Sequence, residues 1–316
     1  MKINPSVSII IPTYNRASFL RTAIQSVLNQ IYPNIIEIII IDDSSTDNTE
    51  EVIKELLSVD HRILYKRHVR NRGVLATKNT GLDLASGEFI GILDDDDELF
   101  PDAVNILINK HLEAPMFKII FANCIRSDTK QFSGYGLSKN TVVKYEDVLC
   151  GRVHGEYWGI FAKALLGADR FNENMRGLEG HLWLKLYQRS DAYYIHKPVR
   201  LYRVGHTSII TTAEEVPGLT AQTYGKFIEM YKEDFVKFCP KYLSKLLYIK
   251  AYFAVISGSK KQAIKDLFES FRYNFLNWRV YVLLIWLPFP TRLVKFLDRW
   301  LQVSKEKLFK VLKMLA

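Results

Sequence analysis

The first half of the chain alternates short strand-like runs with segments of helical periodicity, and this alternation constrains the fold more than any other feature. Strand-like runs occupy residues 7–11, 35–41, 62–69, 88–93 and 117–125. Between them, residues 18–30, 46–59, 73–85 and 101–112 have the apolar spacing of amphipathic helices. The order predicts right-handed crossovers and an α/β fold with a mainly parallel sheet and helices on both faces. Two helix starts carry further signals, because Asp47 and Glu50 have capping-box spacing and Pro101 stands at a first helical position.

The second half predicts a change of architecture. Residues 127–141 are polar and contain Gly134 and Gly136, which indicates a loop or lid. Strands are expected at 157–163 and 192–203, and a helix at 178–189. After Pro217 the pattern is helical to the end, with helices expected at 242–257, 260–273, 278–287 and 291–315. We therefore expect an α/β domain at residues 1–216, with halves at 1–126 and 127–216, and an all-helical C-terminal extension at 217–316.

The net charge of +9 is concentrated in the predicted helical region. Residues 1–216 hold 25 Lys and Arg against 27 Asp and Glu, whereas residues 217–316 hold 18 against 7. This division indicates a catalytic or binding unit followed by a part that meets an anionic surface. A hydrophobic content of 48% with 24% charged residues excludes wholesale disorder.

Cysteine usage and hydropathy favour the cytoplasm. The cysteines Cys124, Cys150 and Cys239 are far apart in sequence and odd in number, which suits neither a disulfide framework nor a zinc site. The N-terminal apolar run is broken by Pro12 and does not resemble a secretory signal. The longest apolar run, residues 280–289, has about half of the ~20 residues that a membrane span needs. We expect a protein without membrane spans.

Polar clusters follow four of the predicted strands, at the sheet edge where α/β proteins bind ligands. These clusters are PTYNR at 12–16, DDSSTD at 42–47, NRG at 71–73 with KNTG at 78–81, and DDDDE at 94–98. Adjacent carboxylates raise one another's pKa unless a cation is present, so the last cluster suggests Mg²⁺ or Mn²⁺. The alternative is a solvated acidic loop before a helix. Asp43 is a candidate acceptor for a nucleobase N–H or a turn residue, and Lys78 a phosphate contact or a solvated lysine.

In the order and spacing of these motifs, the chain resembles inverting family 2 glycosyltransferases, which have the GT-A nucleotide-sugar fold. The matching stretches are VSIIIPTYNR, IIIIDDSSTDNT, NRGVLATKNTGLDLASGEFIGILDDDD and LYRVGHTSI. The resemblance implies inverting transfer of a sugar from a nucleoside-diphosphate sugar to an acceptor hydroxyl. The expected setting is cell-envelope polysaccharide or lipid-linked glycan synthesis, with a glycan or lipid-linked acceptor. The basic C-terminal region carries none of these motifs.

The resemblance also implies residue roles. Pro12, Tyr14 and Arg16 would line the nucleotide pocket, Asp43 would read the base, and Lys78 stands where the family often has an arginine near the phosphates. Asp94, Asp95 and Asp96 match the Asp-x-Asp motif, with Asp94 nearer the ribose and Asp96 as ligand of Mn²⁺ or Mg²⁺. His206 matches a histidine that approaches the diphosphate or metal, although a surface loop histidine is the alternative.

The sequence departs from the family pattern at the expected catalytic base. Family members usually have Glu-Asp at the start of the helix that corresponds to residues 178–189 here, with the Asp as base. Here Glu179 matches the Glu, but Gly180 stands in place of the Asp and carries no side chain. Glu179 is our candidate base, and His181 is close in sequence. The alternative is a catalytically impaired nucleotide-sugar-binding protein. An oxidoreductase is disfavoured because no G-x-G-x-x-G follows the first strand, and no nucleic-acid module is recognisable.

The last predicted helix is basic and amphipathic. Residues 290–316 contain seven Lys and Arg against two Asp and Glu, and their apolar side chains gather near one helix face. Trp278, Tyr281 and Trp286 precede this segment. Basic amphipathic helices with aromatic residues bind anionic membranes in the plane of the interface, so we expect peripheral contact with the inner face of the cell membrane. The alternative is a helix that packs its apolar stripe on the catalytic domain.

Overall fold

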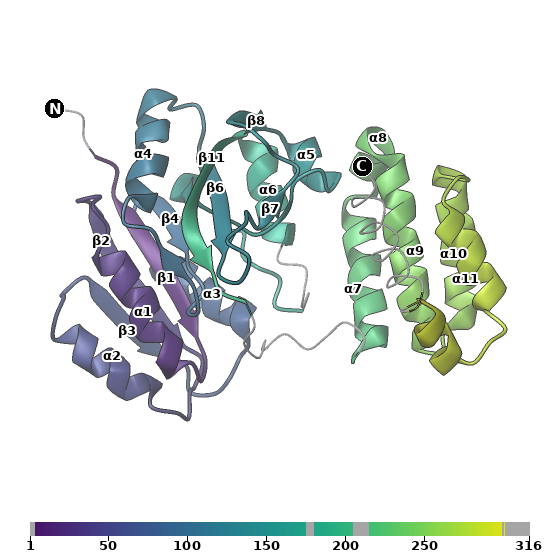
Figure 1. The fold of residues 1–316 in the computed structure, drawn as a ribbon, viewed down its shortest axis with the longest axis horizontal. Coiled ribbons are helices and arrows are strands. Elements are labelled where there is room, and N and C mark those ends of the chain that lie inside the picture. The colour runs from purple at the N-terminus through teal and green to yellow at the C-terminus, as the bar shows by residue number, and fades with distance from the viewer. Residues whose placement is uncertain (1–3, 175–179, 205–214, 299, 301–316) are drawn as a thin grey trace. The chain divides into compact units, whose positions relative to one another are not determined.

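The computed structural model describes residues 4–174, 180–204, 215–298 and 300. The chain divides into two compact units, Met1–Thr207 and Ser208–Ala316, and each is described by itself. The first unit is an α/β domain and the second is helical throughout its described part (Figure 1).

The first unit is built on a nine-stranded mixed sheet. Its main strand order is β3-β2-β1-β4-β10-β6-β11-β5, and β8 pairs with β11. The bounds are β1 (Val7–Thr13), β2 (Ile35–Asp42), β3 (Ile63–Arg67), β4 (Phe89–Ile92), β5 (Glu98–Leu99), β6 (Ile119–Arg126), β8 (Thr141–Val143), β10 (Tyr157–Ala162) and β11 (Ala192–Tyr202). Strands β1 to β4 are parallel, as expected, and β6 is parallel to β11. β10 runs antiparallel between β4 and β6 and joins the two parallel groups.

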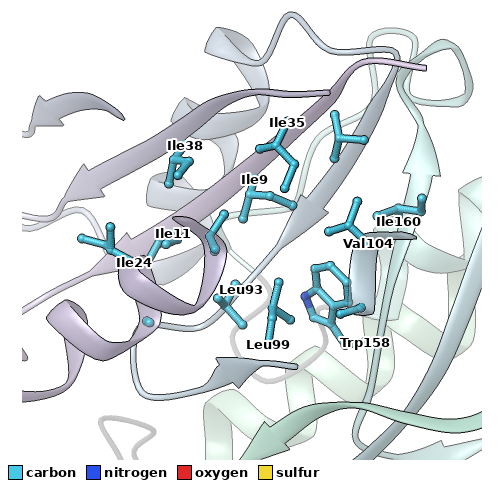
Figure 2. Packing of buried hydrophobic residues seen from close by; sticks show 14 of the residues in the cluster. Ile9, Ile11, Ile24, Ile35, Ile38, Leu93, Leu99, Val104, Trp158 and Ile160 are labelled. Atoms are coloured by element: carbon cyan, nitrogen blue, oxygen red, sulfur yellow. The ribbon is translucent and has the colours of Figure 1, made fainter. Parts of the chain in front are cut away.

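Alternating side chains of the buried strands build two cores, one on each face of the sheet. Ile9 and Ile11 of β1 pack with α1 (Ala17–Leu28), α2 (Thr49–Leu57) and α4 (Ala103–Glu113), as Figure 2 shows for part of this cluster. Ile10 points to the other face and packs with α3 (Val74–Leu84) and α6 (Gly180–Arg189). Because successive strand residues face opposite sides, a continuous isoleucine run supplies both cores.

A glycine sets the distance between α3 and the sheet. A Cβ atom at Gly81 would lie 2.3 Å from Cγ2 of Ile10, so only glycine lets the helix backbone approach β1 this closely. Gly81 lies near the C-terminal end of α3, so this contact sets how closely that end of the helix packs on the sheet.

Several smaller elements lie in residues 134–165 of the first unit. These are β7 (Gly134–Tyr135), α5 (Tyr145–Leu149), β9 (His154–Gly155) and the 3₁₀ turn η1 (Lys163–Leu165). β7 pairs with β9, so part of the segment expected to be a loop is strand. The expected capping box is wrong, because the N-cap is Asn48 and Asp47 instead accepts a hydrogen bond from the Thr49 backbone. The expected start of α4 is also wrong, because the helix begins at Ala103.

The second unit contains α7 (Pro217–Met230), α8 (Lys232–Phe238), α9 (Pro240–Ile256), α10 (Lys260–Tyr273) and α11 (Trp278–Trp286). α9 lies at its centre and is buried along much of its length, with Ala251 and Val255 fully enclosed. Val294, in the helical residues that follow Pro290, joins the same core. Among the described residues, no helix has both the length and the apolarity that a membrane crossing requires.

Candidate functional site

The motif-bearing loops converge at the carboxyl ends of β2, β1 and β4. Thr13 ends β1 beside Asp42, which ends β2, and β4 lies on the other side of β1. Because these three neighbouring strands are parallel, the residues that follow them emerge at one edge of the sheet. The expected grouping of the strand-end motifs is therefore present.

Three contacts tie the acidic run after β4 to residues far away in sequence. The Thr13 hydroxyl donates to Asp95 Oδ2 at 2.6 Å. Arg16 forms an ion pair with Asp96, and Lys78 Nζ lies 3.4 Å from Asp94 Oδ1. The structure thus brings together the predicted site residues Arg16, Lys78, Asp94, Asp95 and Asp96. Pro12 is buried within β1, and Tyr14 is half-buried in the loop after it.

Neighbouring carboxylates of the acidic run have opposite pKa shifts. The Lys78 ammonium holds the pKa of Asp94 below its usual value, with help from Arg200 and against the effect of burial. Burial raises the pKa of Asp95 to about 7, and the charges of Asp96 and Asp94 add to this shift. The main cause is burial at Asp95 and the charge of a lysine at Asp94, so these neighbouring carboxylates lie in different environments.

Oxygen ligands for a divalent cation are present in this run. Asp94 is partly exposed, and Asp96 is paired with Arg16, so a metal ion bound by Asp96 would have to share that carboxylate with the guanidinium. Among the described residues, no group of three His, Cys, Asp or Glu side chains is arranged as a metal site. His206 lies outside the described residues. The donor chemistry fits Mg²⁺ or Mn²⁺, and the metal stays a prediction.

Asp43 is buried and organises the loop that leads into α3. Its Oδ1 accepts hydrogen bonds from His68 Nδ1 at 2.7 Å and from the Arg72 backbone N–H at 2.8 Å. Its Oδ2 accepts from the Gly73 backbone N–H at 2.7 Å. Gly73 has a φ of 88°, a conformation that favours glycine. The expected base-reading residue thus also fixes the backbone around it.

Asn15 joins the first two loops and was missed by the sequence reasoning. Its backbone φ is 53°, in the left-handed region, and its Oδ1 accepts a hydrogen bond from the Thr46 backbone N–H at 2.7 Å. Its own N–H donates to Ser45 Oγ at 2.9 Å. Strained backbone held by specific hydrogen bonds is common at functional sites. The signal that could have found Asn15 is asparagine's tolerance of the left-handed region in a strand-end loop.

Arg200 of β11 was also missed, and it connects the two halves of the domain. It is 3% exposed, and its Nη1 lies 2.9 Å from Asp97 Oδ2 and 4.0 Å from Asp94 Oδ2. Its Nη2 lies 3.0 Å from Glu156 Oε2, and its Nε donates to the buried Cys124 Sγ at 3.1 Å. Burial by itself would lower the pKa of Arg200, but these acidic neighbours raise it above its usual value. Nothing in the local sequence distinguishes Arg200 from a surface arginine.

The predicted base lies at the edge of the described structure. Glu179 is outside the described residues, while Gly180 is the first residue of α6. A Cβ atom at Gly180 would meet nothing within 4 Å, so the position has room for a side chain. The neighbouring His181 is buried, and burial together with the Lys185 charge lowers its pKa. A buried imidazole at this place is poorly suited to replace the missing aspartate.

Comparisons with known proteins identify the family of this chain. The family model described as "Glycosyl transferase family 2" matches residues 8–162. A Campylobacter jejuni protein named GalNAc(5)-diNAcBac-PP-undecaprenol beta-1,3-glucosyltransferase is 34% identical over 311 residues, covering 93% of this chain and 97% of that one. Glycosyltransferase GlyA of Streptococcus pneumoniae is 30% identical, covering 66% of this chain and 32% of that protein.

The solved structures show the same fold. S. aureus TarS 1–349 superposes with a TM-score of 0.61 at 18% identity, covering 87% of this chain and 82% of that one. A complex of that protein with UDP-GlcNAc gives the same TM-score at 14% identity, covering 84% of this chain and 91% of that one. The expected GT-A fold is confirmed.

Proposed function

We propose that this chain, which belongs to glycosyl transferase family 2, transfers a sugar from a nucleoside-diphosphate sugar to a hydroxyl of a lipid-linked glycan, with inversion. The observation that carries the proposal is the convergence of the strand-end motifs through the pairs Thr13–Asp95, Arg16–Asp96 and Lys78–Asp94. The C. jejuni relative, which matches along nearly its whole length, is named for an undecaprenol-linked substrate and supports this acceptor class.

Two of the described residues, Asp43 and Lys78, support the proposed binding of a nucleotide-sugar donor. Asp43 Oδ2 accepts one described hydrogen bond, so it has the capacity to accept another from a base N–H. Lys78 is buried close to Asp94, where its charge stabilises the negative charge that develops on the leaving diphosphate. A divalent cation held by Asp96, with His206 as a further candidate ligand, would supply additional charge stabilisation at the same place.

Proton removal from the acceptor is the step for which the chain differs from its family. We assign it to Glu179, because a carboxylate at the start of α6 is the acidic group nearest in sequence to the family's base position. A Cβ atom at Gly180 would meet no other atom within 4 Å, so an aspartate side chain would fit at the family's base position. A nucleotide-sugar-binding protein without transfer is the second candidate function, and the missing side chain at Gly180 is the observation that favours it.

The basic helical unit suits an acceptor that resides in a membrane. Residues 217–316 hold 18 Lys and Arg against 7 Asp and Glu, which favours peripheral attachment to an anionic leaflet. We place the protein at the inner face of the cell membrane, where nucleotide sugars are available to it. The expected terminal amphipathic helix lies largely outside the described residues.

The proposal is tested in two steps. Thermal shift with a panel of nucleotide sugars, with and without Mn²⁺, identifies the donor, because a ligand that binds the folded state raises the midpoint of unfolding. Transfer from that donor is then measured with polyprenyl-diphosphate-linked glycans. Donor-dependent product on the lipid-linked acceptor supports the proposal. Donor binding without transfer to any acceptor of this class favours the binding protein, and the absence of any donor shift refutes both.

A further inference from the structure

The second unit exposes a row of large apolar side chains on α10 and α11. On α10 and the turn after it, exposed apolar residues recur at helical spacing, and on α11 and just beyond it they do so again. We call this row the α10–α11 apolar face; it consists of Ile264, Phe268, Phe271, Phe275, Trp278, Tyr281, Ile285 and Phe289. Phe268 is 63% exposed and Ile285 is 67% exposed. Apolar patches of this kind on a folded protein mark interaction surfaces.

The row is continuous across the two helices. The rings of Phe271 and Tyr281 meet edge to face with centroids 5.9 Å apart, and the Tyr281 hydroxyl donates to the Phe275 carbonyl oxygen at 2.6 Å. At the other end, Lys260 Nζ donates to the Phe289 carbonyl oxygen at 3.2 Å. The start of α10 therefore lies beside the end of α11, and the helices run antiparallel, side by side (Figure 1).

Basic side chains border this face, and the nearby acids are engaged elsewhere. Lys261, Lys265 and Arg272 are exposed along α10, rotated from the apolar residues by roughly a quarter turn at ~100° per residue. The two acids of α10 are held by lysines of other helices: Asp266 lies 2.8 Å from Lys250, and Glu269 lies 2.7 Å from Lys232. α11 has no acidic residue.

We propose that the α10–α11 apolar face docks in the plane of an anionic membrane. Apolar and aromatic side chains would enter the boundary between headgroups and acyl chains, while the lysines and arginines contact anionic headgroups. Tryptophan and tyrosine are common at this depth. A second copy of this chain fits less well, because two copies of the face would bring like-charged borders together. The proposal rests on the lipid-linked acceptor of the proposed function, and it names α10 and α11 as the attachment.

Flotation with vesicles of neutral lipid, or of neutral lipid mixed with anionic phosphatidylserine, tests the docking. The test variant is Phe268→Ser with Ile285→Ser. The matched control is Met230→Ser with Val236→Ser, because these side chains are 47% and 44% exposed on α7 and α8 of the same unit. Neither double variant changes the charge. Thermal unfolding of both variants shows that each is folded.

We expect the parent and the control to float with anionic vesicles at low salt and to dissociate at high salt. The test variant should bind anionic vesicles at least about tenfold more weakly than the parent, because it lacks two of the side chains that would insert. Equal binding of the two variants overturns the proposal, as does a parent that ignores anionic vesicles. If the parent does not float but forms a concentration-dependent dimer that the test variant alone has lost, the face serves self-association instead. The nucleotide-sugar thermal shift is measured on the same samples, so failed docking is distinguishable from failed donor binding.

Discussion

Replacing Arg200 by methionine should strongly destabilise the first unit. Arg200 and Asp97 are 3% and 1% exposed, with Nη1 and Oδ2 2.9 Å apart. At an effective dielectric constant of about 20, Coulomb's law gives an attraction of about 6 kcal/mol at this distance. Desolvation offsets part of this attraction, since burial raises the pKa of Asp97 to about 7 even beside Arg200. Removing Arg200 leaves a buried carboxyl that must stay uncompensated or take up a proton. We therefore expect Arg200→Met to lower the free energy of unfolding by about 3–5 kcal/mol.

A surface pair provides the matched control for this substitution. Arg152 lies 2.8 Å from Asp147, and the Arg152 side chain is 57% exposed. Arg152→Met should cost at most about 1 kcal/mol, because exposed ion pairs contribute little. The double variant Arg200→Met with Asp97→Asn should recover part of the loss, since it removes the buried charge as well.

Urea unfolding followed by tryptophan fluorescence measures all of these variants, and donor titration of those that fold reports on the site. Arg200 also lies near Asp94, so the folded double variant should bind donor more weakly than the Arg152→Met protein. If Arg200→Met costs no more than Arg152→Met, the buried pair does not hold the two halves together. That outcome would refute the reasoning.

Three further predictions concern the metal, the catalytic base and a buried glutamate. Asp96→Asn should abolish Mn²⁺-dependent donor binding in a thermal-shift titration, because it removes a charged oxygen ligand of the metal. The control Asp102→Asn changes a carboxylate that is hydrogen-bonded to Lys197 and should leave donor binding intact. If Asp96→Asn binds donor and Mn²⁺ like the parent, Asp96 is not a ligand of the metal. Glu179→Gln should lower kcat by roughly 10²–10⁴-fold with little change in donor affinity, because it removes the assigned general base. Gly180→Asp restores the family's carboxylate at a position with space for a side chain, and it should raise the transfer rate. Unchanged rates in both variants would show that residues 179 and 180 take no part in the reaction. Burial would raise the pKa of Glu37, but hydrogen bonds from Ser8, Ser86 and Gly87 lower it, so its contribution to the free energy of unfolding is present above the unfolded-state pKa and is lost as the pH falls through the lowered value. Glu37→Gln should therefore lower the free energy of unfolding by about 1.5–3 kcal/mol at neutral pH, measured by chemical unfolding. A variant that keeps the parent's sensitivity to acid would contradict this.

The parallel part of the sheet was predictable because its signals are local. The isoleucine run of β2 indicated a strand buried on both faces, and both cores use it. The strand-end motifs located the site because the carboxyl ends of parallel strands meet at one edge. Of the aromatic residues that the sequence analysis expected near a membrane, Trp278 and Tyr281 are exposed, whereas Trp286 packs against the core of the helical unit. Helical periodicity alone does not distinguish an outer face from one covered by a neighbouring helix.

By itself, the sequence determined the alternation of strands and helices in the first unit, the family and the strand-end motifs that meet at one edge of the sheet, because each depends on local periodicity or on motifs that stand together in the chain. The tertiary structure decided which charges neutralise which. Arg16, Lys78 and Arg200 come from separate parts of the chain, yet each pairs with a carboxylate of the acidic run, Arg16 from 80 residues away, Lys78 from 16 and Arg200 from 103. Asp97 looked like one more member of that run, and only its burial against Arg200 makes it structural. Such pairings depend on distance and desolvation, which exist only once strands remote in sequence lie side by side.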